Sequence, residues 1–132
     1  MSLAGRRSGL VGRVVAAALL ATAALAPAAC TPLPPARKVT DMSLIAGEWQ
    51  GQIAFARGPY QLFYLTINPD GTLVARWGGN WRWGNVTLEE RYTRFSFYIW
   101  SGNLDYLEGA GDRVLLLKED FFQWDAIVRP LR

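Results

Sequence analysis

The sequence predicts an all-β protein, an eight-stranded antiparallel up-and-down barrel that follows an N-terminal signal and a proline-rich tether. From Leu44 onward apolar and polar residues alternate with a period of two, which is typical of half-buried strands. The six tryptophans, five tyrosines and six phenylalanines all lie between Trp49 and Trp124. A single domain rich in large buried rings is therefore expected after the tether.

Each strand is predicted from an alternating run that ends at turn residues. In the first run Trp49 and Ile53 alternate with Gln50 and Gln52, and Arg57-Gly58-Pro59 then breaks the pattern. The expected strands comprise residues 49–55, 60–67, 72–77, 81–88, 92–100, 104–107, 113–118 and 121–129.

Turn residues separate the later strands. Asn68-Pro69-Asp70-Gly71 combines a proline that presets φ with a glycine that accepts a left-handed conformation. Ser101-Gly102-Asn103 and Gly109-Ala110-Gly111-Asp112 are expected to form two further hairpins. Such short connections imply antiparallel neighbours, and closure into a barrel removes exposed sheet edges.

Residues 1–29 are predicted to be an export signal. Arg6, Arg7 and Arg13 precede the uncharged run 14–25, which has the length of a signal-peptide apolar region and is short for a membrane-spanning helix. Gly9 stands where a twin-arginine signal usually has a large apolar residue, so general secretion is favoured.

Cys30 is the only cysteine and has no partner for an intramolecular disulfide. The segment 25–30, Leu-Ala-Pro-Ala-Ala-Cys, resembles a bacterial lipobox, where a lipoprotein signal peptidase cuts before a diacylglyceryl-modified cysteine. The resemblance implies lipid attachment at Cys30 on the periplasmic face of a bacterial envelope. Thr31, rather than Asp, follows the cysteine, which in the common sorting pattern implies the outer membrane. The alternative is an incidental free thiol.

Residues 30–43 are predicted to comprise the lipidated cysteine and a linker. Pro32, Pro34 and Pro35 favour extended geometry and disfavour a helix or a central strand. At about 3.1 Å per residue, the stretch 31–40 would hold the barrel domain, residues 44–132, roughly 30 Å from a membrane surface. A disordered linker would have the same consequence.

Two parts of the sequence resemble a known group of barrels. Gly47-Glu48-Trp49 opens the first strand, and Arg129 lies near the end of the last. With this strand order they resemble the calycin group, which includes lipocalins, fatty-acid-binding proteins, avidins and small bacterial protease inhibitors. In that group an arginine commonly packs across the first-strand tryptophan. The resemblance implies a cation–π contact between Trp49 and Arg129 that closes the base of the barrel.

The segment 76–84, Arg-Trp-Gly-Gly-Asn-Trp-Arg-Trp-Gly, has two predicted registers. A loop of Gly79-Asn80 places Trp77 opposite Arg82 and on the other face from Trp81. A loop of Gly78-Gly79-Asn80 pairs Trp77 with Trp81 and brings the neighbouring rings to one face.

These rings support two interpretations. In the first, they line a site for a small apolar or glycan ligand at the barrel mouth, and the candidate residues are Trp77, Trp81, Trp83 and Trp100. In the second, they fill a small core, because large aromatic side chains dominate core burial. An eight-stranded barrel is just wide enough for either arrangement.

Catalytic residues are scarce. The chain has no histidine and its one cysteine is assigned to the anchor, so His-based triads, thiol catalysis and His/Cys metal sites are excluded. The carboxylate pairs lie at predicted turns, where solvated charge is usual; a two-carboxylate glycosidase is the alternative. Gly109-Ala110-Gly111-Asp112 precedes a strand and lacks the helix N-terminus of a phosphate loop. We therefore expect no enzyme activity, cofactor or metal.

The charge balance limits the partners. Three of the 14 basic residues lie in the export signal, whereas all 11 acidic residues lie beyond position 40, so the exported chain is near neutral. No nucleic-acid partner is expected. Two functions stay open: binding of a small ligand, or an interaction with an envelope protein. The second includes a protease-inhibitor-like barrel, in which the N-terminal segment would enter an enzyme cleft.

Overall fold

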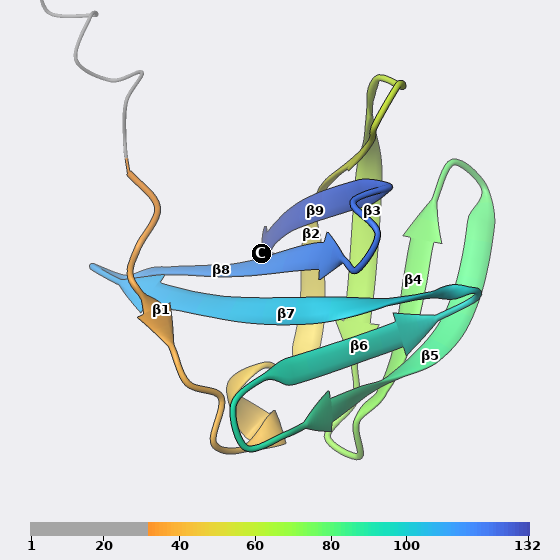
Figure 1. Ribbon diagram of the computed structural model, residues 1–132. Helices are drawn as coiled ribbons and strands as arrows, with labels where there is room; N and C mark the ends of the chain where they lie inside the picture. Colours follow the sequence, from red (N-terminus) through yellow and green to blue (C-terminus); the bar gives the residue numbers. More distant parts are fainter. Residues whose placement is uncertain (1–31) are drawn as a thin grey trace, which may run out of the picture. The chain divides into compact units, whose positions relative to one another are not determined.

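The computed structural model describes residues 32–132, and Leu33–Arg132 form one compact unit. The predicted signal, residues 1–29, and the predicted lipid attachment at Cys30 lie outside the described residues. Eight antiparallel strands form a closed barrel in chain order, with β9 beside β2 (Figure 1). The all-β, up-and-down barrel prediction is confirmed, and this strand order is consistent with a calycin-like fold.

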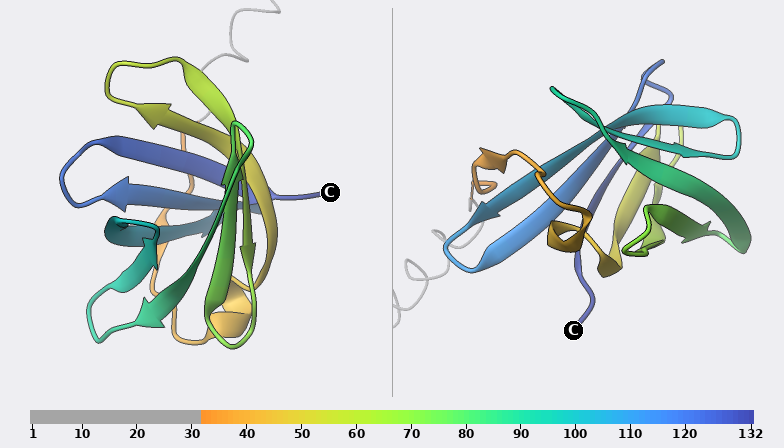
Figure 2. Two further views of the ribbon diagram at one scale, coloured as in Figure 1. Left: turned by 90° about the vertical axis from the view of Figure 1, so that its right-hand side faces the viewer. Right: turned by 90° about the horizontal axis from the view of Figure 1, so that it is seen from below.

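Each barrel strand pairs with the next one in the chain, and the last pairs with the first. A 3₁₀ turn, Met42–Leu44, precedes them. Figure 2 shows the barrel from two further sides. The strands are β2 (Gly47–Phe55), β3 (Tyr60–Ile67), β4 (Thr72–Trp77), β5 (Asn80–Leu88), β6 (Thr93–Phe97), β7 (Trp100–Gly109), β8 (Asp112–Glu119) and β9 (Trp124–Pro130).

The predicted hairpin at residues 101–103 is wrong. The chain turns instead at Tyr98 and Ile99, and residues 101–103 lie inside β7. Gly102 is opposite both Phe95 and Glu119, and a Cβ at this position would lie 2.0 Å from the carbonyl oxygen of Lys118. The glycine thus permits close approach of the neighbouring strands, one of the roles of a glycine inside a strand.

The tether is partly docked on the barrel. The two-residue strand β1 (Ala36–Arg37) pairs with Leu107 and Tyr106 of β7. This edge is free because β6 has five residues and β7 has ten, so the second half of β7 extends beyond its neighbour. The backbone N–H of Glu108 also donates to the Pro35 carbonyl at 3.1 Å.

Because β1 is docked on β7, the expectation that residues 31–40 form a free extended spacer is wrong. Val39 is buried in the core cluster, so the chain from β1 to the first barrel strand is part of the folded unit. Only Thr31 and Pro32 separate Cys30 from Leu33, where that unit begins. Three residue steps span at most about 11 Å, instead of the roughly 30 Å expected from a free tether.

Large side chains fill the barrel interior. The rings of Phe95, Phe97, Trp77, Trp100 and Trp124 form a continuous cluster of mostly tilted and edge-to-face contacts, with centroid separations between 5.4 and 5.9 Å. Separations in this range are typical of favourable aromatic pairs. The interior is therefore a packed core.

Candidate functional site

The register of the β4–β5 hairpin decides where the tryptophans point. Its turn is Gly78-Gly79, with φ of 48° and 81°, and Trp77 lies opposite Asn80. Neither predicted loop is correct. Because side chains alternate along a strand, Trp77 nevertheless faces away from Trp81, as the shorter of the two predicted loops implied.

Two of the four candidate ligand-binding tryptophans belong to the core. Trp77 is 7% exposed, and its ring centroid lies 5.6 Å from that of half-buried Trp100. Trp100 in turn contacts Trp124 at 5.6 Å. For these two residues, the core-filling interpretation describes the observed packing.

The other two candidates lie on the outer wall of the barrel. Trp81 is 51% exposed and Trp83 is 69% exposed. Trp81 is opposite Arg76 on β4, and Arg76 is opposite Tyr64 on β3. The structure therefore separates the four predicted residues into a core pair and a wall pair.

Tyr64, Arg76 and Trp81 form a row across three strands, which we call the wall row. The guanidinium carbon of Arg76 lies 4.7 Å from the centroid of each ring. A shallow recess of about 220 Å³ adjoins the row and is also lined by Leu62 and Asn80. The row combines planar apolar surfaces with the N–H donors of a guanidinium.

Sequence reasoning missed Tyr64 and Arg76, although the signal was present. Tyr64 lies between Phe63 and Leu65, which are 0% and 1% exposed. Alternation thus assigns Tyr64 to the outer face. The pairing of Arg76 with Tyr64 additionally requires the β3–β4 register, which the turn at residues 68–71 sets.

The expected contact between Trp49 and Arg129 is not formed, and Arg113 takes this place. The Arg113 guanidinium lies 5.2 Å from the Trp49 ring, and its Nη2 donates to the Leu44 carbonyl at 2.6 Å. Its Nε donates to the Tyr106 hydroxyl at 3.2 Å. The barrel base is therefore closed by an arginine from β8 and not from β9.

Strand parity explains this difference. Arg129 is opposite Gln50, and its neighbour Pro130 is opposite Trp49, so Arg129 points to the outer face. There its Nε pairs with Asp112 at 3.2 Å, and its side chain is 50% exposed. Arg113 lies on the same face of β8 as the buried Leu115 and Leu117. This alternation in the sequence indicates that the Arg113 side chain points into the barrel.

The carboxylate pair Glu119-Asp120 stabilises the β8–β9 turn. Glu119 is 3% exposed, and its Oε2 accepts hydrogen bonds from the backbone N–H groups of Phe121 and Gln123, both at 2.9 Å. Asp120 receives two hydrogen bonds from Arg94, at 2.8 and 2.6 Å. These bonds lower the pKa of Asp120 below its ordinary value of 3.8.

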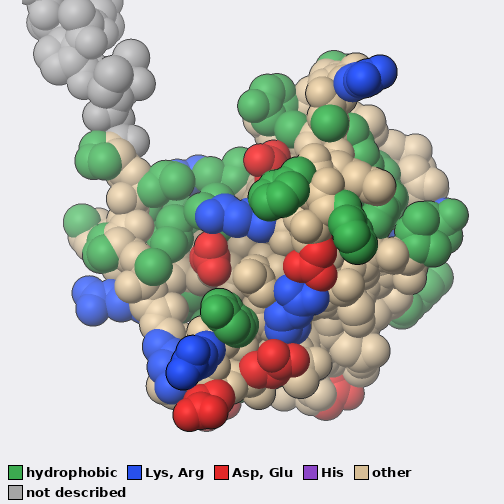
Figure 3. Space-filling model, viewed as in Figure 1, with side chains coloured by type: hydrophobic (Ala, Val, Ile, Leu, Met, Phe, Trp, Pro, Cys, Tyr) green, Lys and Arg blue, Asp and Glu red, His purple; other side chains and the backbone are tan. Residues whose placement is uncertain are grey.

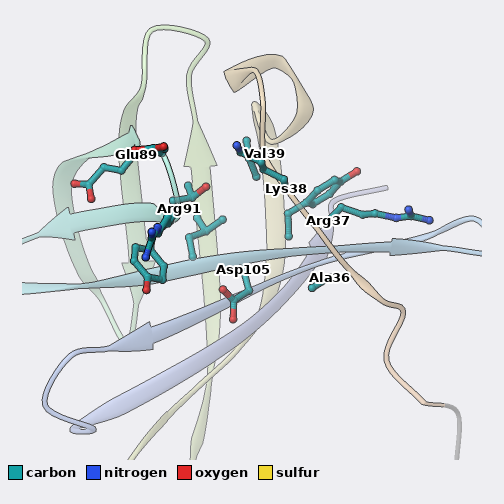
Figure 4. A pocket seen from close by; sticks show the side chains of 12 residues that line it. Ala36, Arg37, Lys38, Val39, Glu89, Arg91 and Asp105 are labelled. Carbon is teal, nitrogen blue, oxygen red and sulfur yellow. The ribbon is translucent and has the colours of Figure 1, made fainter.

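A second hollow, of about 420 Å³, lies between the N-terminal segment and the β5–β6 turn. Figure 4 shows Glu89 and Arg91 on one side of it and Arg37 and Lys38 on the other. Asp105 also lines this hollow and pairs with Lys118 at 3.4 Å. Charges of both signs are interspersed here and over the face shown in Figure 3, so neither region selects a ligand by net charge.

Within residues 32–132, no group of three His, Cys, Asp or Glu side chains is arranged to hold a metal ion. The same part of the chain contains no helix with the length and hydropathy that crossing a bilayer demands.

The fold and the wall row define the class of this molecule: a small closed antiparallel barrel with a filled interior and an aromatic outer wall. No family model matches the sequence, and no curated protein or solved structure is significantly similar to it.

Proposed function

We propose that this chain is a non-enzymatic envelope lipoprotein whose barrel binds a glycan on its outer wall. The observation that carries the proposal is the wall row, in which one guanidinium lies 4.7 Å from two aromatic rings beside an open recess. The pyranose ring of a sugar has apolar faces and a polar edge, so it can stack on Trp81 while Arg76 and Asn80 bind its hydroxyl groups.

The filled interior favours a glycan over an apolar ligand. A fatty acyl chain would need a lumen, and in this barrel that volume is occupied by the packed rings of Phe95, Phe97 and Trp100. A sugar can instead bind to an exposed surface, because its hydroxyl groups remain partly solvated. Trp83, 69% exposed on the same strand as Trp81, extends the surface available for a second sugar.

The protease-inhibitor alternative has less support. It requires a free N-terminal segment that can enter an enzyme cleft, whereas Ala36–Arg37 pair with β7. The wall row does not depend on that segment.

We expect Trp81→Ala to weaken glycan binding about tenfold, which corresponds to about 1.4 kcal/mol. The suitable protein comprises residues 32–132, which contain the whole barrel and its core. Calorimetric titration with soluble cell-wall glycan fragments measures the affinity. Tyr92→Ala is the matched control, because Tyr92 is a 56% exposed ring outside the wall row. Unchanged affinity in Trp81→Ala, or absence of binding by the unaltered protein, would refute the proposal.

The lipoprotein part of the proposal rests on the lipobox-like segment before Cys30. We expect the full-length protein, produced in bacteria supplied with an alkyne fatty acid, to incorporate the label. Cys30→Ser should abolish incorporation, because the thiol that carries the acyl group is removed. Equal labelling of both proteins would exclude lipid attachment at this residue.

A further inference from the structure

Three turns at one end of the barrel expose large apolar side chains. Because the strands alternate in direction, the turns after β2, β6 and β8 lie at the same end (Figures 1 and 2). We call them the open-end turns. The exposed side chains in or next to these turns include Tyr60 (70%), the first residue of β3, and Tyr98 (59%), Ile99 (76%), Phe121 (81%) and Phe122 (88%).

The core does not bury these side chains, although the Tyr98 ring makes an edge contact with half-buried Trp100, with centroids 5.4 Å apart. Tyr98 and Phe122 have φ of 55° and 57°, in the left-handed region that costs a non-glycine residue roughly 1–2 kcal/mol. At Gly78-Gly79 and Gly111 the chain uses glycine for such conformations, and at Ala110, with φ of 51°, it uses a small side chain. Rings at strained, solvent-exposed positions indicate that the side chains contact something outside the barrel.

Arginines accompany each open-end turn. Arg57 lies in the first, the Arg82 guanidinium lies 4.7 Å from the Tyr98 ring, and Arg94 neutralises Asp120 in the third at 2.6 Å. Carboxylates prevail in the turns at the opposite end of the barrel, which contain Asp70, Glu89 and Glu90. Arg57 and Arg82 form no ion pair among the described residues, whereas Arg94 is paired and Glu119 and Asp125 flank the third turn. The open end is therefore apolar, with unpaired arginines beside two of its three turns.

We propose that the open-end turns insert their apolar side chains into the surface of an anionic phospholipid bilayer. The side chains stand on separate turns, and a bilayer can accommodate separate protrusions, whereas a protein partner would need a complementary pocket for each. Aromatic rings are enriched at the membrane–water interface, and Arg57 and Arg82, which form no ion pair among the described residues, would pair with lipid phosphates. This surface uses none of the wall-row residues, although the Gly78-Gly79 turn beside the recess lies at the same end. It lies at the opposite end of the barrel from Glu108, beside which Pro35 docks, so it is separate from the docked N-terminal segment.

The test measures sedimentation of residues 32–132, which lack Cys30 and the export signal, with lipid vesicles. We expect binding to vesicles of phosphatidylglycerol and phosphatidylethanolamine, and at least tenfold weaker binding to phosphatidylcholine. Phe121→Ser combined with Phe122→Asn should reduce binding at least tenfold; asparagine tolerates the left-handed backbone at residue 122. Trp83→Ser is the matched control, because it removes an exposed ring from the wall.

Three outcomes would overturn the proposal. The unaltered protein could fail to sediment with anionic vesicles, or the double variant could bind as well as the unaltered protein. In the third, a photo-crosslinker at residue 121 captures a protein in cells while vesicles leave the barrel in solution, which would assign the turns to a protein partner. Thermal unfolding confirms that each variant is folded. The glycan titration tests the wall row through Trp81, so its outcome does not depend on whether the open-end turns bind vesicles.

Discussion

Gly51→Ala is expected to destabilise the barrel by about 3 kcal/mol or more and to loosen the closure between β2 and β9. A Cβ on Gly51 would lie 1.8 Å from the Ile127 carbonyl oxygen and 2.8 Å from the Val128 Cα. Both obstacles are backbone atoms of β9, so no side-chain rotation can relieve the clash. Denaturant unfolding of residues 32–132, followed by tryptophan fluorescence, measures the loss of stability.

Gly58→Ala is the matched control for this prediction. A Cβ there would approach only the Phe55 Cβ, at 3.9 Å, which is an ordinary contact. Its stability should stay within about 0.5 kcal/mol of the unaltered protein. Similar unfolding midpoints for the two variants would show that β2 and β9 are not as closely apposed at Gly51 as the structure indicates.

Arg113→Ala is expected to cost about 2–3 kcal/mol of folding stability, because a charged hydrogen-bonding group leaves the barrel base. The substitution removes the donors to the Leu44 carbonyl, at 2.6 Å, and to the Tyr106 hydroxyl, at 3.2 Å. It also removes the cation that lies 5.2 Å from the Trp49 ring. Thermal and denaturant unfolding measure the loss, and near-ultraviolet circular dichroism should report a changed Trp49 environment.

Arg129→Ala provides the comparison that separates the two candidate closing arginines. Its side chain is 50% exposed and pairs with Asp112 at 3.2 Å, so its loss should cost less than about 1 kcal/mol. A larger effect for Arg129→Ala than for Arg113→Ala would restore the closure implied by the calycin resemblance.

The strand content of this protein could be predicted because its signals are local. Alternation from Trp49 onward and the turn at residues 68–71 give strand limits that closely match β2, β3 and β4. The same reasoning was wrong at Gly102, since a glycine within an alternating run can mark either a turn or a close approach between strands. Which one applies depends on Lys118, sixteen residues away in the sequence.

The candidate site was only partly predictable. The exposed tryptophans Trp81 and Trp83 were identified, but the sequence placed Trp77 and Trp100 with them. A hairpin turn of Gly78-Gly79 assigns Trp77 to the core, and shifting this register by one residue would exchange the faces. The pairing of Arg76 with Tyr64 places a second ring beside the arginine that contacts Trp81, and no local sequence pattern specifies this pairing.

The sequence alone determined the all-β class, the order of the strands and the alternation of inward and outward side chains, because these follow from residue period and turn chemistry. Only the tertiary structure decided that Arg113 covers Trp49, that β1 docks beside β7 and that the wall row assembles. Each of these depends on inter-strand register and on unequal strand lengths, which bring together residues far apart in the chain.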